Sequence, residues 1–465
     1  MAHSDTFLQI DASISVSHSG NPASLAYSTA RTRWPKILKN IIVDVENTVQ
    51  DVDSTNKIRD DGSALLAALQ TVLDSMESDG RLQPIPNDGN EVIGSFNREL
   101  DFLGPMTWHN SPWLFTENYL YRLIHNCFAR RETQFWKDYD PFAKQKANAL
   151  KSSKSSIIEL VHWVLDVNRK VNEKSLTAAE DLKAIMEEAL QISLWGNAVD
   201  LLLLVHVSTE DLQSRQGKKA RENFKKNVVD DDTEQVWELL APLPARHPNN
   251  EIHIVLDNAG FEFLADLILV SHLLAAGYAE KVVLHGKDIP WFVSDVTAKD
   301  FDFLLETFET SGFSEPTTEE EQKWTAEFSA QLREYSRSGR LRYEAHSFWT
   351  TQHCYARMQT IAPDLWTQLC AADLVIFKGD LNYRKLVFDG LWPRTTSFRD
   401  AIGLLGKPLA TGDMGMRILS LRTCKADTVV GLSPGKEKEI DPDATGQWTR
   451  NGEYAVISFC DNKGE

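Results

Sequence analysis

Apolar residues recur at intervals of three and four along the first half of the chain, from about Arg33 to Leu194. Each apolar stripe is flanked by charged residues, which is the pattern of an amphipathic helix that buries one face. Two stripes show it clearly: Leu65, Leu66, Leu69, Val72, Leu73 and Met76, and then Ile157, Leu160, Val161, Val164 and Leu165. The spacing predicts a helical bundle. The aromatic residues between Trp108 and Phe128 are expected to pack in its core rather than to form a ligand cage.

The composition changes between Ser208 and Asn250, where a basic stretch is followed by acidic residues and then by prolines. This order predicts a mobile or helical excursion followed by a connector. We therefore expect four segments. They are an N-terminal extension over 1–30, a helical domain over 31–206, the excursion and connector over 207–250, and an α/β catalytic domain over 251–465.

After residue 250, short β-branched runs alternate with stretches that are long enough for helices. The runs that predict strands are Ile252–Leu256, Lys281–His285, Leu341–Ala345, Leu374–Phe377, Ile418–Arg422 and Tyr454–Phe459. Such alternation predicts a largely parallel sheet with helices on both faces. The predicted fold class is therefore α/β, preceded by an all-helical domain.

The charge balance limits the partners that this chain can bind. Its 465 residues include 49 Lys and Arg against 67 Asp and Glu, a net charge of −18, which opposes nucleic-acid backbones and anionic lipid. The longest basic patch, Arg215 to Lys226, is followed at once by acidic residues. We expect no nucleic-acid or membrane partner, and with 42% apolar residues the chain can bury a large core.

The cysteines and the apolar windows indicate the compartment. The five cysteines are odd in number, widely spaced and without a Cys-x-x-Cys pair, so neither a disulfide framework nor a zinc knuckle is indicated. The first thirty residues lack the basic and apolar regions of a secretory signal. The most apolar window, Leu264–Ala279, is shorter than the roughly 20 residues that span a bilayer. We expect no transmembrane segment, and a cytoplasmic protein that could also enter the nucleus.

Polar residues that carry chemistry follow four of the predicted strands, which is where ligands bind in an open α/β sheet. The first strand runs into Asp257 and Asn258, and the second leads to Asp295. A later strand ends in the segment Lys378–Lys385, and another in Arg422–Lys425. Carboxylate and amide oxygens suit a divalent cation, whereas the basic residues suit an anion. Together they indicate phosphate chemistry.

Each of these features alone has a simpler explanation. Asp257 and Asn258 could form a turn or a helix N-cap, and Asp295 could cap the helix that follows it. The segment Lys378–Lys385 could be the solvated start of a helix, and Arg422–Lys425 could carry surface charges. Their shared position at strand ends favours the joint interpretation.

Other catalytic signatures are absent from the sequence. There is no His-Glu-x-x-His, no Gly-x-Ser-x-Gly, no Gly-x-Gly-x-x-Gly and no Walker A motif. His253 and His285 fall inside predicted strands, where we expect core or rim histidines rather than ligands.

Long motifs in both halves resemble one family, the metal-dependent damage-control phosphatases, and most closely its branch that is also named for acidic-residue (protein-glutamate) methyltransferase activity. In the α/β half the motifs are 257–262 (DNAGFE), 289–295 (IPWFVSD), 377–385 (FKGDLNYRK) and 421–427 (LRTCKAD). In the helical half they are 33–35 (RWP), 111–117 (SPWLFTE) and 194–197 (LWGN). The resemblance covers nearly the whole chain except the first thirty residues and the excursion after Ser208.

The resemblance implies a Rossmann-like α/β/α sandwich behind the helical domain, with one divalent metal ion, Mn, Mg, Co or Ni, held by Asp257, Asn258 and Asp295. It also implies hydrolysis of a small sugar phosphate of the fructose 1-phosphate or fructose 6-phosphate class by a monomeric protein. The residues that the resemblance places around the substrate phosphate are Asp380, Leu381, Asn382, Tyr383, Arg384 and Lys425. Further candidates are Glu262, Lys378, Arg422 and Asn197.

Two other functions remain open. One is an S-adenosylmethionine-dependent protein-glutamate methyltransferase with Glu262 near the cofactor, although methyl transfer needs neither a metal site nor opposing cations. The other is a non-catalytic metabolite-sensing module, which would retain the fold and lose the ligands, whereas all three ligands are present.

Overall fold

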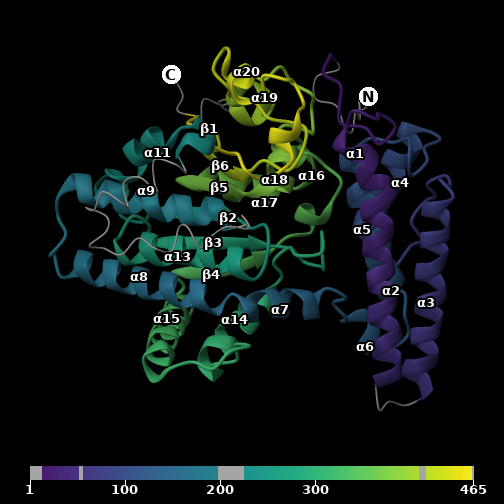
Figure 1. Ribbon diagram of the computed structural model, residues 1–465, viewed down its shortest axis with the longest axis horizontal. Coiled ribbons are helices and arrows are strands. Elements are labelled where there is room, and N and C mark those ends of the chain that lie inside the picture. The colour runs from purple at the N-terminus through teal and green to yellow at the C-terminus, as the bar shows by residue number, and fades with distance from the viewer. Residues whose placement is uncertain (1–12, 52–55, 197–224, 408–414, 463–465) are drawn as a thin grey trace.

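The computed structural model describes residues 13–51, 56–196, 225–407 and 415–462. Figure 1 shows a helical region beside a layered region that contains the sheet. The helical region consists of α1 (Leu25–Ser28), a π-helical turn η1 (Thr29–Arg33), α2 (Trp34–Asp51), α3 (Asn56–Glu77), α4 (Val92–Leu103), α5 (Trp113–Ala129) and α6 (Gln134–Lys137).

The sheet has seven strands in the order β1-β7-β6-β5-β2-β3-β4. The strands are β1 (Val228–Asp231), β2 (Glu251–Val255), β3 (Lys281–Gly286), β4 (Leu341–Ala345), β5 (Leu374–Lys378), β6 (Ile418–Thr423) and β7 (Ala455–Cys460). Every pair of neighbours is parallel except β6 and β7. The largely parallel sheet is therefore confirmed, and β2 to β7 lie within one residue of the six predicted strands.

Strand β1 lies inside the segment that was expected to be an excursion and connector. It pairs with β7 at one edge of the sheet, and α11 (Thr233–Leu240) and α12 (Leu243–Arg246) follow it. The sequence reasoning missed β1 because the strand has four residues and two of them, Asp230 and Asp231, are acidic, which is an unfavourable strand composition. Residues 208–224 of the excursion lie outside the described residues.

Helices cover both faces of the sheet, as the alternation of strands and helices predicted. Within β5, Leu374 and Ile376 pack into one hydrophobic cluster and Val375 and Phe377 into another, because successive side chains of a strand point to opposite faces. The helices of the first cluster are α8 (Lys154–Asn172), α9 (Ala179–Trp195), α11, α13 (Phe261–Ala275), α14 (Ala298–Thr310) and α15 (Glu319–Arg337). The second face is covered by α17 (Pro363–Ala371), α18 (Gly379–Leu386), α19 (Phe398–Ala401) and the short turns around them.

The last helices of the segment 31–206 pack with the sheet. The cluster of the helical region runs from Ala26 to Phe142 and also includes Ile289, Trp291, Leu381 and Ala426 of the α/β region. The cluster that includes one sheet face begins at Leu150. Helices α8 and α9, which follow α7 (Ala143–Ser152), contact α13 and so belong to the layer over the sheet. An amphipathic pattern shows that a helix buries one face but not which partner covers it.

Helix α13 coincides with the most apolar window of the sequence. Every residue from Glu262 to Leu274 is buried, since α8 and α9 lie against this helix. A helix that is apolar all round is buried in a large core or in a membrane. In the described part of the chain, no helix combines the length and apolar character needed to cross a bilayer.

Candidate active site at the sheet edge

A cavity of about 710 Å³ lies where the carboxyl ends of β2, β5 and β6 face the helical region. Residues of the α/β region that line it include Asp257, Asn258, Glu262, Asp295, Asp380, Leu381, Arg384 and Lys425. The helical region contributes Arg33, Trp113 and Glu117. The structure therefore brings eight of the residues proposed from sequence to one cavity, which is the position expected for a ligand in an open α/β sheet.

Backbone hydrogen bonds join the loop after β2 to the loop before α14. Asn258 and Asp295 form an isolated antiparallel bridge, and the Val296 backbone nitrogen donates to the Asp257 carbonyl oxygen at 2.9 Å. Phe292 and Val293 have positive φ angles of 42° and 71°, a conformation that a β-branched residue such as Val293 rarely adopts. Strained backbone of this kind concentrates at functional sites.

The alternative roles as helix caps are not what the structure shows. Helix α13 has Gly260 as its N-cap, and α14 has Thr297, which forms a capping box with Asp300. Asp257 and Asp295 therefore remain available to the cavity.

Three buried carboxyl groups concentrate negative charge here. Burial raises the pKa of Asp257 well above its usual value, and the nearby charges of Glu262 and Asp295 raise it further. The pKa of Glu262 and that of Asp295 are also raised, again chiefly by burial. Lys287 opposes part of this charge, since its ammonium lies 3.2 Å from Asp295 Oδ2. Such a cluster would be stabilised by a cation.

The donor set fits a hard divalent cation. Asp295 Oδ2 is buried beside the Lys287 ammonium, and the Asn258 amide nitrogen donates to Asp257 Oδ2 and Glu262 Oε2, each at 2.8 Å. The Asn258 amide oxygen accepts from Ser294 Oγ and retains a second lone pair. Among the described residues no three His, Cys, Asp and Glu side chains form a metal-binding group. The candidate set that the resemblance implies consists of two carboxylates and one amide.

Gly379 allows the start of α18 to approach the carboxylate. Its φ is +80°, and a Cβ atom built on it would lie 1.9 Å from Asp257 Oδ2. Lys378, just before it, does not line the cavity. Its ammonium lies 2.7 Å from Asp266 Oδ1 and 3.9 Å from Glu262 Oε1, beneath the site.

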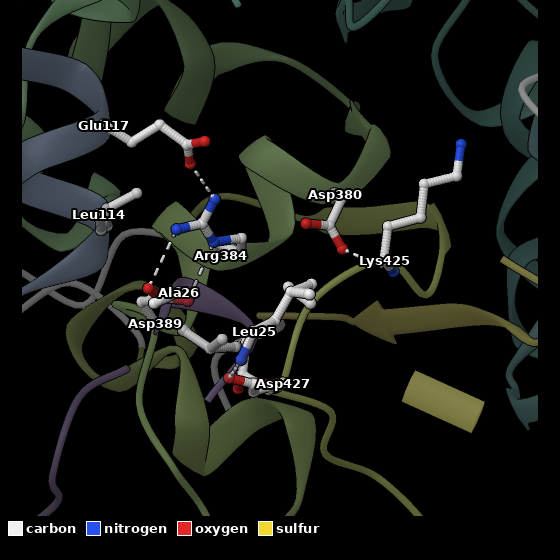
Figure 2. Close-up of polar contacts among 12 residues, drawn as sticks. Leu25, Ala26, Leu114, Glu117, Asp380, Arg384, Asp389, Lys425 and Asp427 are labelled. Carbon is white, nitrogen blue, oxygen red and sulfur yellow. Dashed lines mark hydrogen bonds and ion pairs between the residues drawn. The ribbon is translucent and has the colours of Figure 1, made fainter. Parts of the chain in front are cut away.

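Asp380 is fixed through one of its two oxygens. Asp380 Oδ1 accepts from Arg422 Nε at 2.8 Å. It also accepts from the backbone nitrogen of Lys425 at 3.1 Å (Figure 2). Oδ2 makes no hydrogen bond among the described residues, so one oxygen stays available to a ligand. Arg422 is fully buried, which excludes the alternative of a surface charge, and it orients Asp380.

Arg384 is neutralised by two carboxylates. Its guanidinium lies 2.8 Å from Glu117 Oε2 and 3.0 Å from Asp389 Oδ1, between the two side chains that Figure 2 shows. It also lies over the Trp113 ring at 3.7 Å from the centroid. Arg384 therefore touches the cavity as one member of a buried ion-pair network rather than as an unpaired cation.

Two proposed residues support α18 from behind the cavity. Asn382 donates to the Lys378 carbonyl oxygen at 2.6 Å and accepts from the Tyr355 hydroxyl. The Tyr383 hydroxyl accepts from the Val430 backbone nitrogen at 3.0 Å. Neither residue lines the cavity. The segment Lys378–Lys385 is largely buried, so it is not the solvated helix start that was the simpler explanation. Asn197 lies outside the described residues.

Sequence reasoning missed three residues that shape the site. Lys287 directly follows β3, so the rule that selected strand ends could have included it. Arg33 and Glu117 come from helical segments and stand in the motifs 33–35 and 111–117 that carry the resemblance, but the sequence analysis did not assign them to the site. The packing of the helical region against the sheet edge brings both residues to the cavity.

Comparisons with known proteins match one family over most of the chain. Residues 29–440 match the family model described as the damage-control phosphatase ARMT1-like domain. The chain is 32% identical to the damage-control phosphatase ARMT1 of Mus musculus over 455 residues, which is 94% of this chain and 96% of that protein. It is 32% identical to the Homo sapiens protein of the same name over 453 residues, with the same coverage, and 30% identical to that of Danio rerio over 456 residues, 94% of each chain.

Among solved structures, a DUF89 family protein from Pyrococcus horikoshii is similar at a TM-score of 0.39 and 12% sequence identity. The match covers 95% of this chain and 99% of that chain.

Proposed function

Because the chain belongs to the damage-control phosphatase ARMT1-like family, we propose that it is a metal-dependent phosphomonoester hydrolase that acts on small sugar phosphates. Fructose 1-phosphate and fructose 6-phosphate are the proposed substrate class. One observation carries the proposal. A single cavity is lined by the carboxylate and amide groups of Asp257, Asn258 and Asp295 and also by the cationic side chain of Lys425.

Asp257, Asn258 and Asp295 would hold one divalent cation, Mn, Mg, Co or Ni, through oxygen atoms. A divalent cation supplies Lewis-acid polarisation of a phosphoryl group. Lys287 keeps the Asp295 carboxylate in place through its 3.2 Å ion pair. Gly379 has no Cβ atom, so the Asp257 carboxylate can occupy the space beside it.

The remaining residues of the cavity suit a sugar phosphate. The cavity volume of about 710 Å³ lies within the range of small-molecule sites. Lys425 provides a cation for the phosphate, as charge-assisted hydrogen bonds to phosphate oxygens are strong. The second oxygen of Asp380 can accept a hydrogen bond from a sugar hydroxyl, since Arg422 and the Lys425 backbone hold the first one.

The test is phosphate release from a panel of sugar phosphates by metal-stripped protein, with single divalent ions added back. Asp257→Asn keeps the shape of the side chain and removes the charge, so we expect a loss of roughly a hundredfold or more in turnover together with weakened metal binding. Asp364→Asn is the control, because it removes a carboxylate that is 77% exposed on α17. Undiminished metal-dependent turnover in folded Asp257→Asn protein would refute the assignment.

A further inference from the structure

A short N-terminal helical run is attached to the loop that carries Lys425. The Asp427 carboxylate accepts from the Ser24 hydroxyl at 2.6 Å, from the Leu25 backbone nitrogen at 2.9 Å and from Arg450 Nε at 2.7 Å. Figure 2 shows Leu25 and Asp427 in contact. We call these four residues the Asp427 clamp. Asp427 lies two positions after Lys425 and is only 6% exposed, so its carboxylate fixes the end of that loop.

The same helical run reaches the cavity further along, at Arg33. From Leu25 it continues through η1 into α2, and Arg33, the last residue of the π-helical turn, lines the cavity. The next residue, Trp34, is buried and donates from its indole nitrogen to Glu117 Oε1 at 3.2 Å. Because Glu117 also binds Arg384, this contact sets the position of Arg33 relative to α18. Single π-helical turns inserted in α-helices are frequent at functional sites.

Arg33 differs from other cations of the cavity wall. Arg384 is neutralised by two carboxylates, and Lys154 lies 3.0 Å from Glu321. Arg33 is exposed to the cavity, and its guanidinium has no ion pair or hydrogen bond with any residue that the structure describes. A cation on the wall of an anion site without a counter-charge is suited to bind a ligand oxygen.

The charges around Tyr121 place Arg33 near the carboxylate cluster. Burial raises the pKa of the Tyr121 hydroxyl, the charges of Glu117 and Asp295 raise it further, and the charge of Arg33 opposes the shift. The charges of Arg33 and Asp295 therefore both reach the Tyr121 hydroxyl, and both side chains line the same cavity. Tyr121 stacks on Phe292, the neighbour of Trp291 in the loop that leads to Asp295, at a centroid distance of 4.6 Å.

We propose that Arg33 is a second substrate-binding cation, supplied by the helical region, and that Asp427 is the positioning residue that sets its distance from Lys425. This inference rests on the proposed function and names two residues that the sequence analysis did not assign to the site. The clamp joins the loop of Lys425, which lies two residues before Asp427, to the start of the helical run that carries Arg33. The pocket for the phosphate thus depends on two chain segments about 400 residues apart.

The experiment measures binding of inorganic phosphate by calorimetry to full-length protein loaded with one divalent ion, alongside KM and kcat for a sugar phosphate. Arg33→Met should weaken phosphate binding by roughly tenfold to a hundredfold, as expected for a lost hydrogen bond between charged groups. Lys36→Met is the matched control. It removes the same charge three residues further on, at an exposed position that does not line this cavity, and should leave phosphate binding unchanged.

Asp427→Asn should raise KM by roughly tenfold with a smaller change in kcat, and Ser24→Ala, which removes one donor of the clamp, should do so to a lesser degree. The effects of Arg33→Met and Asp427→Asn should fall short of additive in the double variant, because both act on the same contact. A purely structural role for Asp427 would lower the melting temperature and leave KM unchanged.

Wild-type protein that binds phosphate no better than Arg33→Met protein would overturn this inference alone. Clamp variants with unchanged KM, or fully additive effects, would overturn the positioning role of Asp427. Absence of phosphate release from wild-type protein with every divalent ion would instead overturn the proposed function, and this inference with it.

Discussion

Gly379→Ala tests how closely the start of α18 must approach the carboxylate cluster. The new Cβ would lie 1.9 Å from Asp257 Oδ2 and 2.2 Å from its carboxyl carbon, whereas carbon atoms in contact are about 3.5 Å apart. The Asp257 carboxyl group or the helix start must therefore move by about 1.5 Å. A misplacement of about 1 Å can cost roughly a hundredfold in rate, so turnover should fall by at least that factor.

The backbone adds a separate cost in free energy of unfolding. Alanine at a φ of +80° is disfavoured by about 1–2 kcal/mol, and this part can be isolated with Gly277→Ala. Gly277 has nearly the same φ, +78°, but a Cβ atom there would meet nothing within 4 Å. Both variants should lose comparable stability from the backbone term, and Gly379→Ala alone should lose turnover and metal binding.

The assay combines thermal unfolding, metal titration and phosphate release for the two alanine variants and the wild type. Full turnover and unchanged metal affinity in Gly379→Ala would refute the view that the position of Asp257 depends on the absence of a side chain at residue 379. An equal loss of turnover in Gly277→Ala would show that backbone strain, rather than contact with Asp257, is responsible.

Two further predictions concern the edge strand and the rival chemistry. Burial raises the pKa of Asp230 to about 7, Ser458 lowers it through a hydrogen bond, and the charge of Asp232 raises it. Because the folded state then binds a proton more tightly than the unfolded chain, the free energy of unfolding should fall between about pH 4 and pH 7, by at most about 1.4 kcal/mol per pH unit. Asp230→Asn should remove that decline in melting temperatures measured from pH 5 to pH 8, and an unchanged pH profile would contradict the assignment. Titration of the protein with S-adenosylmethionine should produce no measurable heat, because the cations that oppose the carboxylate cluster offer nothing to a sulfonium cofactor; micromolar binding with methyl transfer to protein carboxylates would favour the methyltransferase instead.

Hydrophobic periodicity in the sequence was enough to predict the sheet. It also indicated the edge of the sheet at which the candidate active site lies. Six strands were placed within a residue. Five of them are largely buried and read as short apolar runs, which are visible without any tertiary information, whereas the edge strand β4 (LRYEA) alternates apolar and charged residues. The carboxyl ends of parallel strands meet at one edge, so Asp257, Asp380 and Lys425 could be assigned to one cavity from their positions after strands.

Only the tertiary structure shows which helices cover the sheet and which charged side chains are neutralised by a partner. The pattern of α8 and α9 shows an apolar face, and only the fold shows that this face covers the sheet rather than the helical region. Arg384 has the sequence context of a phosphate ligand, yet Glu117, 267 residues away, and Asp389 neutralise it. Electrostatic roles depend on distances of a few ångströms between atoms, and residues far apart in the sequence supply those atoms, so residue type and spacing determined where the site lies but not which of its cations remains unpaired.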